Sequence, residues 1–288
     1  MTTQHFLTSA WNWHPTVIAL CALALAGYAQ LRHFRFSGRS LFLLAAVAVF
    51  FVALASPIAA LADGYLFSAH MLQHLLLQLV VPPLVLLSLP TSPMPRAALR
   101  GWLKPVTAIL RRPLITWFLG LGAMWIWHVP SLCSASATNP WVHALQGVSL
   151  LLMGTAFWWP IIGPWRDQWL PPLLGVLYLF SACVGCTILG IILTFAPLGV
   201  CPVFMHPVDR LGILPLLEHE WGLTPARDQQ LGGLLMWVPP CFVYLGGIFG
   251  MFARWYAGPD PEISAPADSK LEPEPPGVAH GHPLREEA

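Results

Sequence analysis

Two histidines, His70 and His74, lie four residues apart at the start of a long apolar segment. If this segment is helical, both imidazoles lie on one face, and Met71 lies three residues before His74 on a neighbouring stripe. Polar side chains are costly in a bilayer, so a histidine pair at this place requires a reason. Imidazoles with a nearby thioether form a ligand set that suits copper. The pattern therefore predicts a copper-binding site.

The composition is that of an integral membrane protein. Of the 288 residues, 56% are hydrophobic and only 9% are charged, whereas soluble domains carry about a quarter charged residues. The mean hydropathy is +0.65. The net charge of +1, together with the lack of a basic helix or a stacked aromatic motif, gives no support to a nucleic-acid partner. The expected surroundings are a lipid bilayer.

Seven apolar stretches are long enough to cross about 30 Å of hydrocarbon. We therefore expect an all-α fold, a polytopic membrane helix bundle with seven transmembrane helices, in residues 1–257. Residues 258–288 are rich in Pro, Glu and Ala and should form a disordered cytoplasmic tail. Pro82-Pro83 and Pro239-Pro240 should kink or break the third and seventh spans. The stretches are 15–31, 40–60, 68–89, 113–129, 140–160, 171–196 and 228–256.

The basic residues predict the orientation of this bundle. Twelve of the fourteen Lys and Arg residues fall on one side of the seven-helix arrangement. The positive-inside rule then places the N-terminus outside and the C-terminus in the cytoplasm. We expect a multi-pass protein of the bacterial plasma (inner) membrane. The twelve are Arg32, Arg35, Arg39, Arg96, Arg100, Lys104, Arg111, Arg112, Arg166, Arg254, Lys270 and Arg285, and the other two are Arg210 and Arg227.

With this topology, three helices bring histidine to the same outer membrane face. His128 closes the fourth span and His143 opens the fifth, at the depth of the histidine pair in the third. Asp228 opens the seventh span, where it could cap its own helix or orient a ligand imidazole. The alternative is that each histidine only anchors its helix at the interface or bonds a neighbour. The predicted metal site comprises His70, His74, His128, His143, Met71 and Asp228.

The cysteines within the spans give a weaker pattern. Cys183-Val-Gly-Cys186 lies in the middle of the sixth span, next to small residues. Helix packing through small residues is one interpretation, and metal transfer or redox chemistry is the other. Cys21 and Cys241 are expected to be buried core residues.

Other metal-binding or sulfur-containing residues fall outside the spans. Cys133 and Cys201 both lie in predicted outer segments, where disulfides form, so we hypothesise that they pair. His280 and His282 in the tail are either solvated or able to bind stray metal.

Motifs of known enzymes are missing from the sequence. It contains no nucleophile elbow, HExxH zinc motif, phosphate loop or dinucleotide fingerprint. We therefore expect no enzymatic activity.

A series of short motifs runs in order across about residues 65–250. They are His70-Met71-Leu72-Gln73-His74, Pro82-Pro83, Trp127-His128-Val129-Pro130, His143, Phe157-Trp158-Trp159-Pro160, Trp221-Gly222-Leu223 and the run from Asp228 to Trp237. In this order the chain resembles the seven-helix CtaG family of cytochrome c oxidase assembly proteins. The resemblance implies a membrane protein needed to assemble haem–copper oxidase, which would handle copper at the outer face. It implies cytochrome c oxidase subunits as partners, with periplasmic copper chaperones as candidate donors. Cys183-Val-Gly-Cys186 does not match the family pattern.

Three functions compete at this point. The first is an assembly factor that binds and delivers copper without turnover. The second is a membrane haem protein, for electron transfer or haem handling, since histidines of facing helices can ligate haem. Against it, the His70–His74 pair lies on one helix face and cannot supply both axial ligands. The third is a copper transporter, which should carry ligands at several depths, yet the inner half offers few beyond Cys183 and Cys186.

Overall fold

The computed structural model describes residues 2–31, 37–90 and 104–258. Within these ranges every regular element is a helix, which confirms the all-α class. The tail predicted from residue 258 onward, with His280 and His282, lies outside the described residues apart from Gly258.

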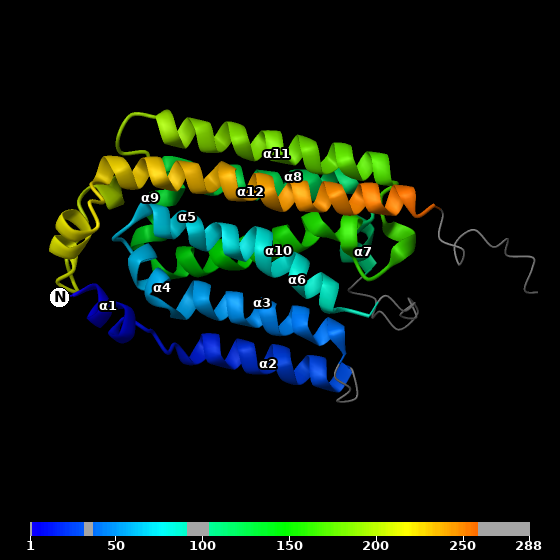
Figure 1. Cartoon of the computed structure of the whole chain (residues 1–288), viewed down its shortest axis with the longest axis horizontal. Coiled ribbons are helices and arrows are strands. Elements are labelled where there is room, and N and C mark those ends of the chain that lie inside the picture. Colours follow the sequence, from blue (N-terminus) through cyan, green and yellow to red (C-terminus); the bar gives the residue numbers. More distant parts are fainter. Residues whose placement is uncertain (1, 32–36, 91–103, 259–288) are drawn as a thin grey trace, which may run out of the picture.

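Seven apolar helical segments run side by side along the long axis of the molecule (Figure 1). Each overlaps one of the seven stretches expected from the sequence. The segments are α2 (Pro15–Leu31), α3 (Gly38–Ala55), the composite helix Phe67–Ser88, α8 (Pro113–Trp127), α10 (Pro140–Ile162), α11 (Pro172–Phe195) and α12 (Pro225–Tyr256).

The expected count of seven spans is not confirmed. Among the described residues, five helices are long and apolar enough to cross a membrane, and a sixth span appears only if a bent pair is counted. That pair is α8 and α9 (Pro130–Thr138), which meet at 74° because Pro130 cannot continue the preceding helix. The apolar α2, with 17 residues, is shorter than the helices counted as spans and is therefore not among the five. The side of the membrane on which each terminus lies stays a prediction.

Short helices gather at one end of the bundle, at the left of Figure 1, which we call the capped end. They are α1 (Thr3–Ser9), α4 (Pro57–Ala62), α9, the 3-10 helix η5 (Pro202–Met205) and the π-helix η6 (Leu216–Glu220). Phe6, Leu61, Leu66, Ile213 and Leu217 form a small apolar core there. Two further short helices are α7 (Lys104–Leu110) and η4 (Arg166–Gln168).

The helix that carries the histidine pair is irregular. It consists of α5 (Phe67–Leu75), the π-helix η1 (Leu76–Val80) and α6 (Val81–Ser88). Pro82 and Pro83 lack the amide donors that an α-helical turn needs, and the wider turn of η1 precedes them. The predicted irregularity at Pro82-Pro83 is therefore found, whereas α12 continues unbroken through Pro239-Pro240.

Two consecutive glycines let α12 approach its neighbours. A Cβ atom on Gly232 would overlap the Phe67 ring of α5, and one on Gly233 would overlap Thr194 of α11. The start of α12 can therefore lie directly against the start of α5, beside the histidine pair.

Candidate metal site at the capped end

The four histidines predicted from the sequence lie together at the capped end. The ring centroids of His70 and His74 are 4.3 Å apart, those of His74 and His128 are 5.4 Å apart, and those of His70 and His143 are 5.8 Å apart. His70 and His74 are 1% and 2% exposed, so they are sealed from solvent. Helix packing thus brings side chains from α5, α10 and the end of α8 into one cluster.

The ring nitrogens of His70 and His74 lack hydrogen bonds. All four nitrogens are buried without a partner, although Ala62 and the Gln146 amide lie close enough to interact with His70 and His74 respectively. A buried polar group without a partner costs about 1–3 kcal/mol. Such groups in a native protein indicate a bound ligand, ion or water.

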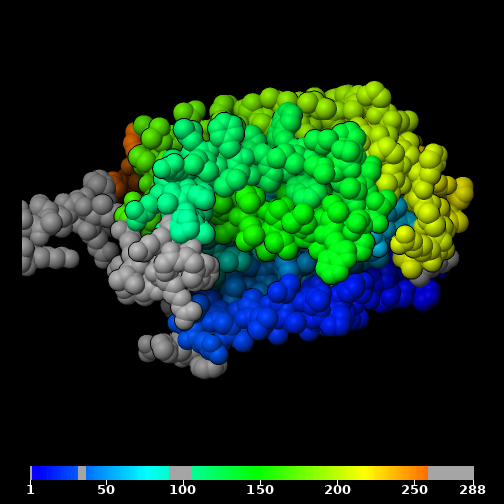
Figure 2. Space-filling model, turned by 180° about the vertical axis from the view of Figure 1, so that it is seen from behind, coloured from blue at the N-terminus to red at the C-terminus, as the bar shows by residue number. Residues whose placement is uncertain are grey.

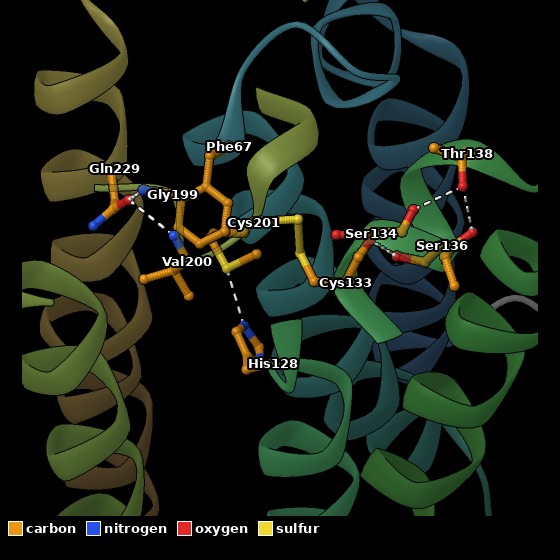
Figure 3. Close-up of a disulfide and its surroundings, with 12 residues drawn as sticks. Phe67, His128, Cys133, Ser134, Ser136, Thr138, Gly199, Val200, Cys201 and Gln229 are labelled. Carbon is orange, nitrogen blue, oxygen red and sulfur yellow. Dashed lines mark hydrogen bonds between the residues drawn. A yellow bond between two sulfur atoms is a disulfide. The ribbon is translucent and has the colours of Figure 1, made fainter. Parts of the chain in front are cut away.

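His128 points its outer nitrogen at a thioether. Its Nδ1 lies 2.5 Å from the carbonyl oxygen of Met124, and its Nε2 lies 3.0 Å from Sδ of Met71. Figure 3 draws the second contact as the dashed line from His128 to a sulfur atom. Because a carbonyl only accepts, Nδ1 donates the proton and a neutral ring keeps its lone pair on Nε2. Nitrogen and sulfur lone pairs then face each other, as they do when both can bind one soft cation. Histidine ligands commonly donate their other ring N–H to a carbonyl in this way.

His143 is held by a residue that the sequence analysis did not consider. Gln73 donates from Nε2 to the Ala53 carbonyl at 2.8 Å, which turns its Oε1 toward His143 Nε2 at 3.2 Å. His143 therefore donates from Nε2 and keeps Nδ1 as its acceptor. Asp63 also interacts electrostatically with this ring. The half-buried His143 lies at the solvent side of the cluster.

Gln146 is a second residue of the site that the sequence analysis did not identify. It is 1% exposed, neither amide atom has a hydrogen-bond partner, and it lies beside His74. Its spacing of three residues from His143 puts both side chains on one face of α10, a signal that was available in the sequence.

Asp228 binds the start of α5 instead of an imidazole. Its carboxylate accepts hydrogen bonds from the backbone N–H groups of Phe67 at 2.6 Å and Ser68 at 3.0 Å, and from Ser68 Oγ at 2.5 Å. An acid at a helix N-terminus satisfies unpaired amides and favours the helix dipole. Its own helix is capped by Thr224. Asp228 thus fixes the helix that carries the histidine pair.

The hypothesised disulfide is present. Cys133 of α9 is bonded to Cys201, which precedes η5, with Cα atoms 5.9 Å apart (Figure 3). Both cysteines pack in one apolar cluster with Phe67 and Met71. The disulfide therefore joins two segments of the capped end directly against the metal-site candidates.

Gln229 secures the segment before the disulfide. Its Oε1 accepts from Gly199 N at 3.0 Å, and its Nε2 donates to the Ala196 carbonyl at 3.2 Å. The chain that leaves α11 is thereby tied to α12.

An open groove of about 510 Å³ lies between the α8–α9 corner and the end of α11. His128 lines it together with apolar side chains that include Trp125, Pro130 and Leu193. Seen from behind, the green segments of α8 to α10 form the front of the bundle (Figure 2). His128 is thus the member of the cluster that borders an open space.

The imidazoles pack against one another and do not surround a preformed gap. Among the described residues, no group of three His, Cys, Asp or Glu side chains is arranged to hold a metal ion. The edge-to-face contact of His70 and His74 shows the same close packing. Metal binding here would require at least one ring to rotate.

Comparison with known proteins identifies one family. The chain matches the cytochrome c oxidase caa3 assembly factor family, Caa3_CtaG, over residues 22–258. It is 27% identical over 209 residues to an uncharacterized protein of Mycobacterium leprae, covering 66% of this chain and 30% of that protein. It is 27% identical over 191 residues to an uncharacterized protein of Mycobacterium bovis, covering 60% of this chain and 27% of that protein. The chain thus spans less than a third of each relative. No solved structure matches it.

Proposed function

We propose that this chain, which belongs to the cytochrome c oxidase caa3 assembly factor family, handles copper for the oxidase through the histidine cluster at the capped end. Family membership implies association with cytochrome c oxidase in a membrane. The finer role proposed here is binding and delivery of copper as cargo, without chemical turnover.

One observation carries this proposal. His70 and His74 hold four buried ring nitrogens without hydrogen bonds, next to the Nε2 of His128 that faces the Met71 thioether. Imidazole nitrogens bind copper in either oxidation state, and a thioether favours Cu(I). A copper ion would satisfy these buried nitrogens, near which only the Ala62 backbone and the Gln146 amide offer a polar group.

The residues have distinct roles in this proposal. His74 lies between His70 and His128, so a rotation of its ring would let it share an ion with either neighbour. Met71 and His128 supply the sulfur and nitrogen already facing each other. His143, at the solvent side, would receive the ion first. Asp228 holds α5 in register and does not touch the metal.

The distribution of charge supports an outer location for the cluster. The capped end carries the segments with Arg210 and Arg227. The other basic residues that the structure describes lie in segments of the opposite end, namely Arg39, Lys104, Arg111, Arg112, Arg166 and Arg254. Copper would then be received on the outer face of a bacterial plasma membrane, from periplasmic copper chaperones, and passed to cytochrome c oxidase subunits.

The cluster geometry disfavours the haem alternative. A haem held by two histidines needs a macrocycle between their rings. The rings of His70 and His74 are in edge-to-face contact at 4.3 Å, and His128 directs its Nε2 at Met71. These contacts leave no space for a porphyrin between the imidazoles.

The test is metal analysis with an optical spectrum on the detergent-purified full chain after loading with Cu(I). We compare the wild type with His74→Ala and with His14→Ala, whose exposed side chain lies outside the cluster. We expect about one copper bound at the cluster in the wild type and in His14→Ala, lost in His74→Ala. Equal copper in all three proteins would contradict the site, and a Soret band would favour the haem alternative.

A further inference from the structure

Three cysteines of α11 and α12 converge in the middle of the tightly packed helix pair. Sγ of Cys183 lies 3.2 Å from Sγ of Cys241, and Cys186 Sγ lies 3.5 Å from the Tyr244 hydroxyl. Cys183 is near the midpoint of α11 and Cys241 is near the midpoint of α12. Cys241, expected from the sequence to be an ordinary core residue, is therefore the partner of Cys183.

The sulfur pair lies at the edge of the helix seam. Cys183 and Cys241 are half-buried, and their neighbours Val184 and Phe242 are 41% and 70% exposed on the apolar outer surface. Thr187 Oγ1, 3.5 Å from Cys241 Sγ, adds a hydroxyl to the group. The pair is thus separate from the histidine cluster of α5, α8 and α10, and side-chain rotation there would not open the bundle core.

We propose that Cys183 and Cys241 bind one Cu(I) ion between α11 and α12, with Cys186 as a further sulfur nearby. Soft sulfur ligands select Cu(I) over harder cations. Zinc requires four ligands, and the described residues hold no group of three that could bind an ion. Cu(I), in contrast, is satisfied by two sulfurs.

Binding at this pair leaves no net charge in its apolar surroundings. Two S–Cu bonds form as the bonds between Cu(I) and its donor ligand break. One S–H bond breaks, its proton is taken up by the released donor, and no electron is transferred. One thiolate and one Cu(I) are neutral together, while the second cysteine binds as a neutral thiol. The complex therefore avoids the large cost of placing a net charge in a medium of low dielectric constant.

This inference does not rest on the histidine cluster. If both sites bind copper, the chain offers ligands at two depths of the bundle, which is the feature that a copper path across the membrane would need. The second site would then connect the capped end to the middle of the bundle.

The test uses the full chain in detergent, kept reduced with a non-thiol reductant and loaded with Cu(I) against a chromophoric Cu(I) chelator. X-ray absorption at the copper edge reports whether sulfur or nitrogen surrounds the metal. The proteins are His74→Ala, the same variant with Cys183→Ser and Cys241→Ser, and the same variant with Cys21→Ser as the control. Cys21 is another half-buried cysteine, on α2.

We expect sulfur-bound copper in His74→Ala, retained with Cys21→Ser, and at least tenfold weaker copper binding with the double cysteine change. Unchanged sulfur-bound copper in the double variant would overturn the proposal. So would a Cys183–Cys241 disulfide, detected by alkylation and mass spectrometry, in protein isolated under reducing conditions. Each single Cys→Ser variant is measured as well, since serine keeps the size and hydrogen bonding of the site but not its soft ligand. The histidine site is judged separately, from copper lost in His74→Ala.

Discussion

Asp228, in the first turn of α12, is hydrogen-bonded to Ser68, in the first turn of α5, through both the backbone N–H and the hydroxyl of the serine. The two residues are 160 positions apart in the chain. Because His70 follows Ser68 by two residues, this contact fixes the height and rotation of the helix that carries the histidine pair. The seventh apolar segment thus positions the third.

Replacing Asp228 should destabilise the whole capped end. Asp228→Ala leaves the donors of Phe67 and Ser68 unpaired, and each buried unpaired donor costs about 1–3 kcal/mol. We expect a clear fall in the midpoint of thermal unfolding, followed by circular dichroism in detergent, together with weaker copper binding. The control is Thr224→Ala, which removes only the exposed cap of α12 and should cost about 1 kcal/mol. Equal effects of the two changes would refute the role given to Asp228.

Met71 should determine preference for the oxidation state of copper. Met71→Leu keeps the volume of this fully buried side chain, so stability should fall by less than about 1.5 kcal/mol. Loss of the thioether should weaken Cu(I) binding about tenfold and leave Cu(II) binding nearly unchanged. Chelator competition with each ion measures both affinities. Met124→Leu is the matched control, because Met124 is buried in the same apolar cluster and its hydrogen bond with His128 is made by its backbone carbonyl, which the change keeps. Similar losses in both variants would point to packing instead of ligation.

Replacing Gln146 should weaken copper binding without lowering the stability of the protein. Its amide is buried without hydrogen bonds, so Gln146→Met removes two unsatisfied atoms at nearly constant size. We expect unfolding at an equal or higher temperature and, because the amide lies beside His74, weaker copper binding. Thermal unfolding and copper competition on the same preparation measure the two effects. A destabilised variant with normal copper affinity would show that Gln146 has only a structural role.

The Cys133–Cys201 disulfide should hold the capped end together. The bond closes a loop of 68 residues, for which the chain-entropy argument gives roughly 4 kcal/mol as an upper value. Replacing both cysteines with serine should lower the unfolding temperature and abolish the shift in gel mobility on reduction. Cys21→Ser should change neither result, since Cys21 is free. A mobility shift that persists in the double variant would show that another pair is bonded.

Most of the helices and the four histidines could be predicted from the sequence. Apolar runs of sufficient length located α3, α10, α11 and α12, and the position of each histidine at a span end predicted its place in the cluster. The count of seven spans is not confirmed, because α8 ends at the 74° bend before α9 and because α2 has only 17 residues. The local composition shows that the segment of α8 is apolar, but it does not predict the bend between α8 and α9.

Local periodicity and the direction of successive spans are enough to predict which segments are helical and at which end of the bundle the imidazoles lie. Tertiary packing sets which side chains meet. It places Asp228 against Ser68, Gln73 against His143 and Cys241 against Cys183. The first and third pairings depend on the close approach of α12 to α5 and α11, which Gly232 and Gly233 allow. Such contacts join residues far apart in the chain, so no local pattern encodes them.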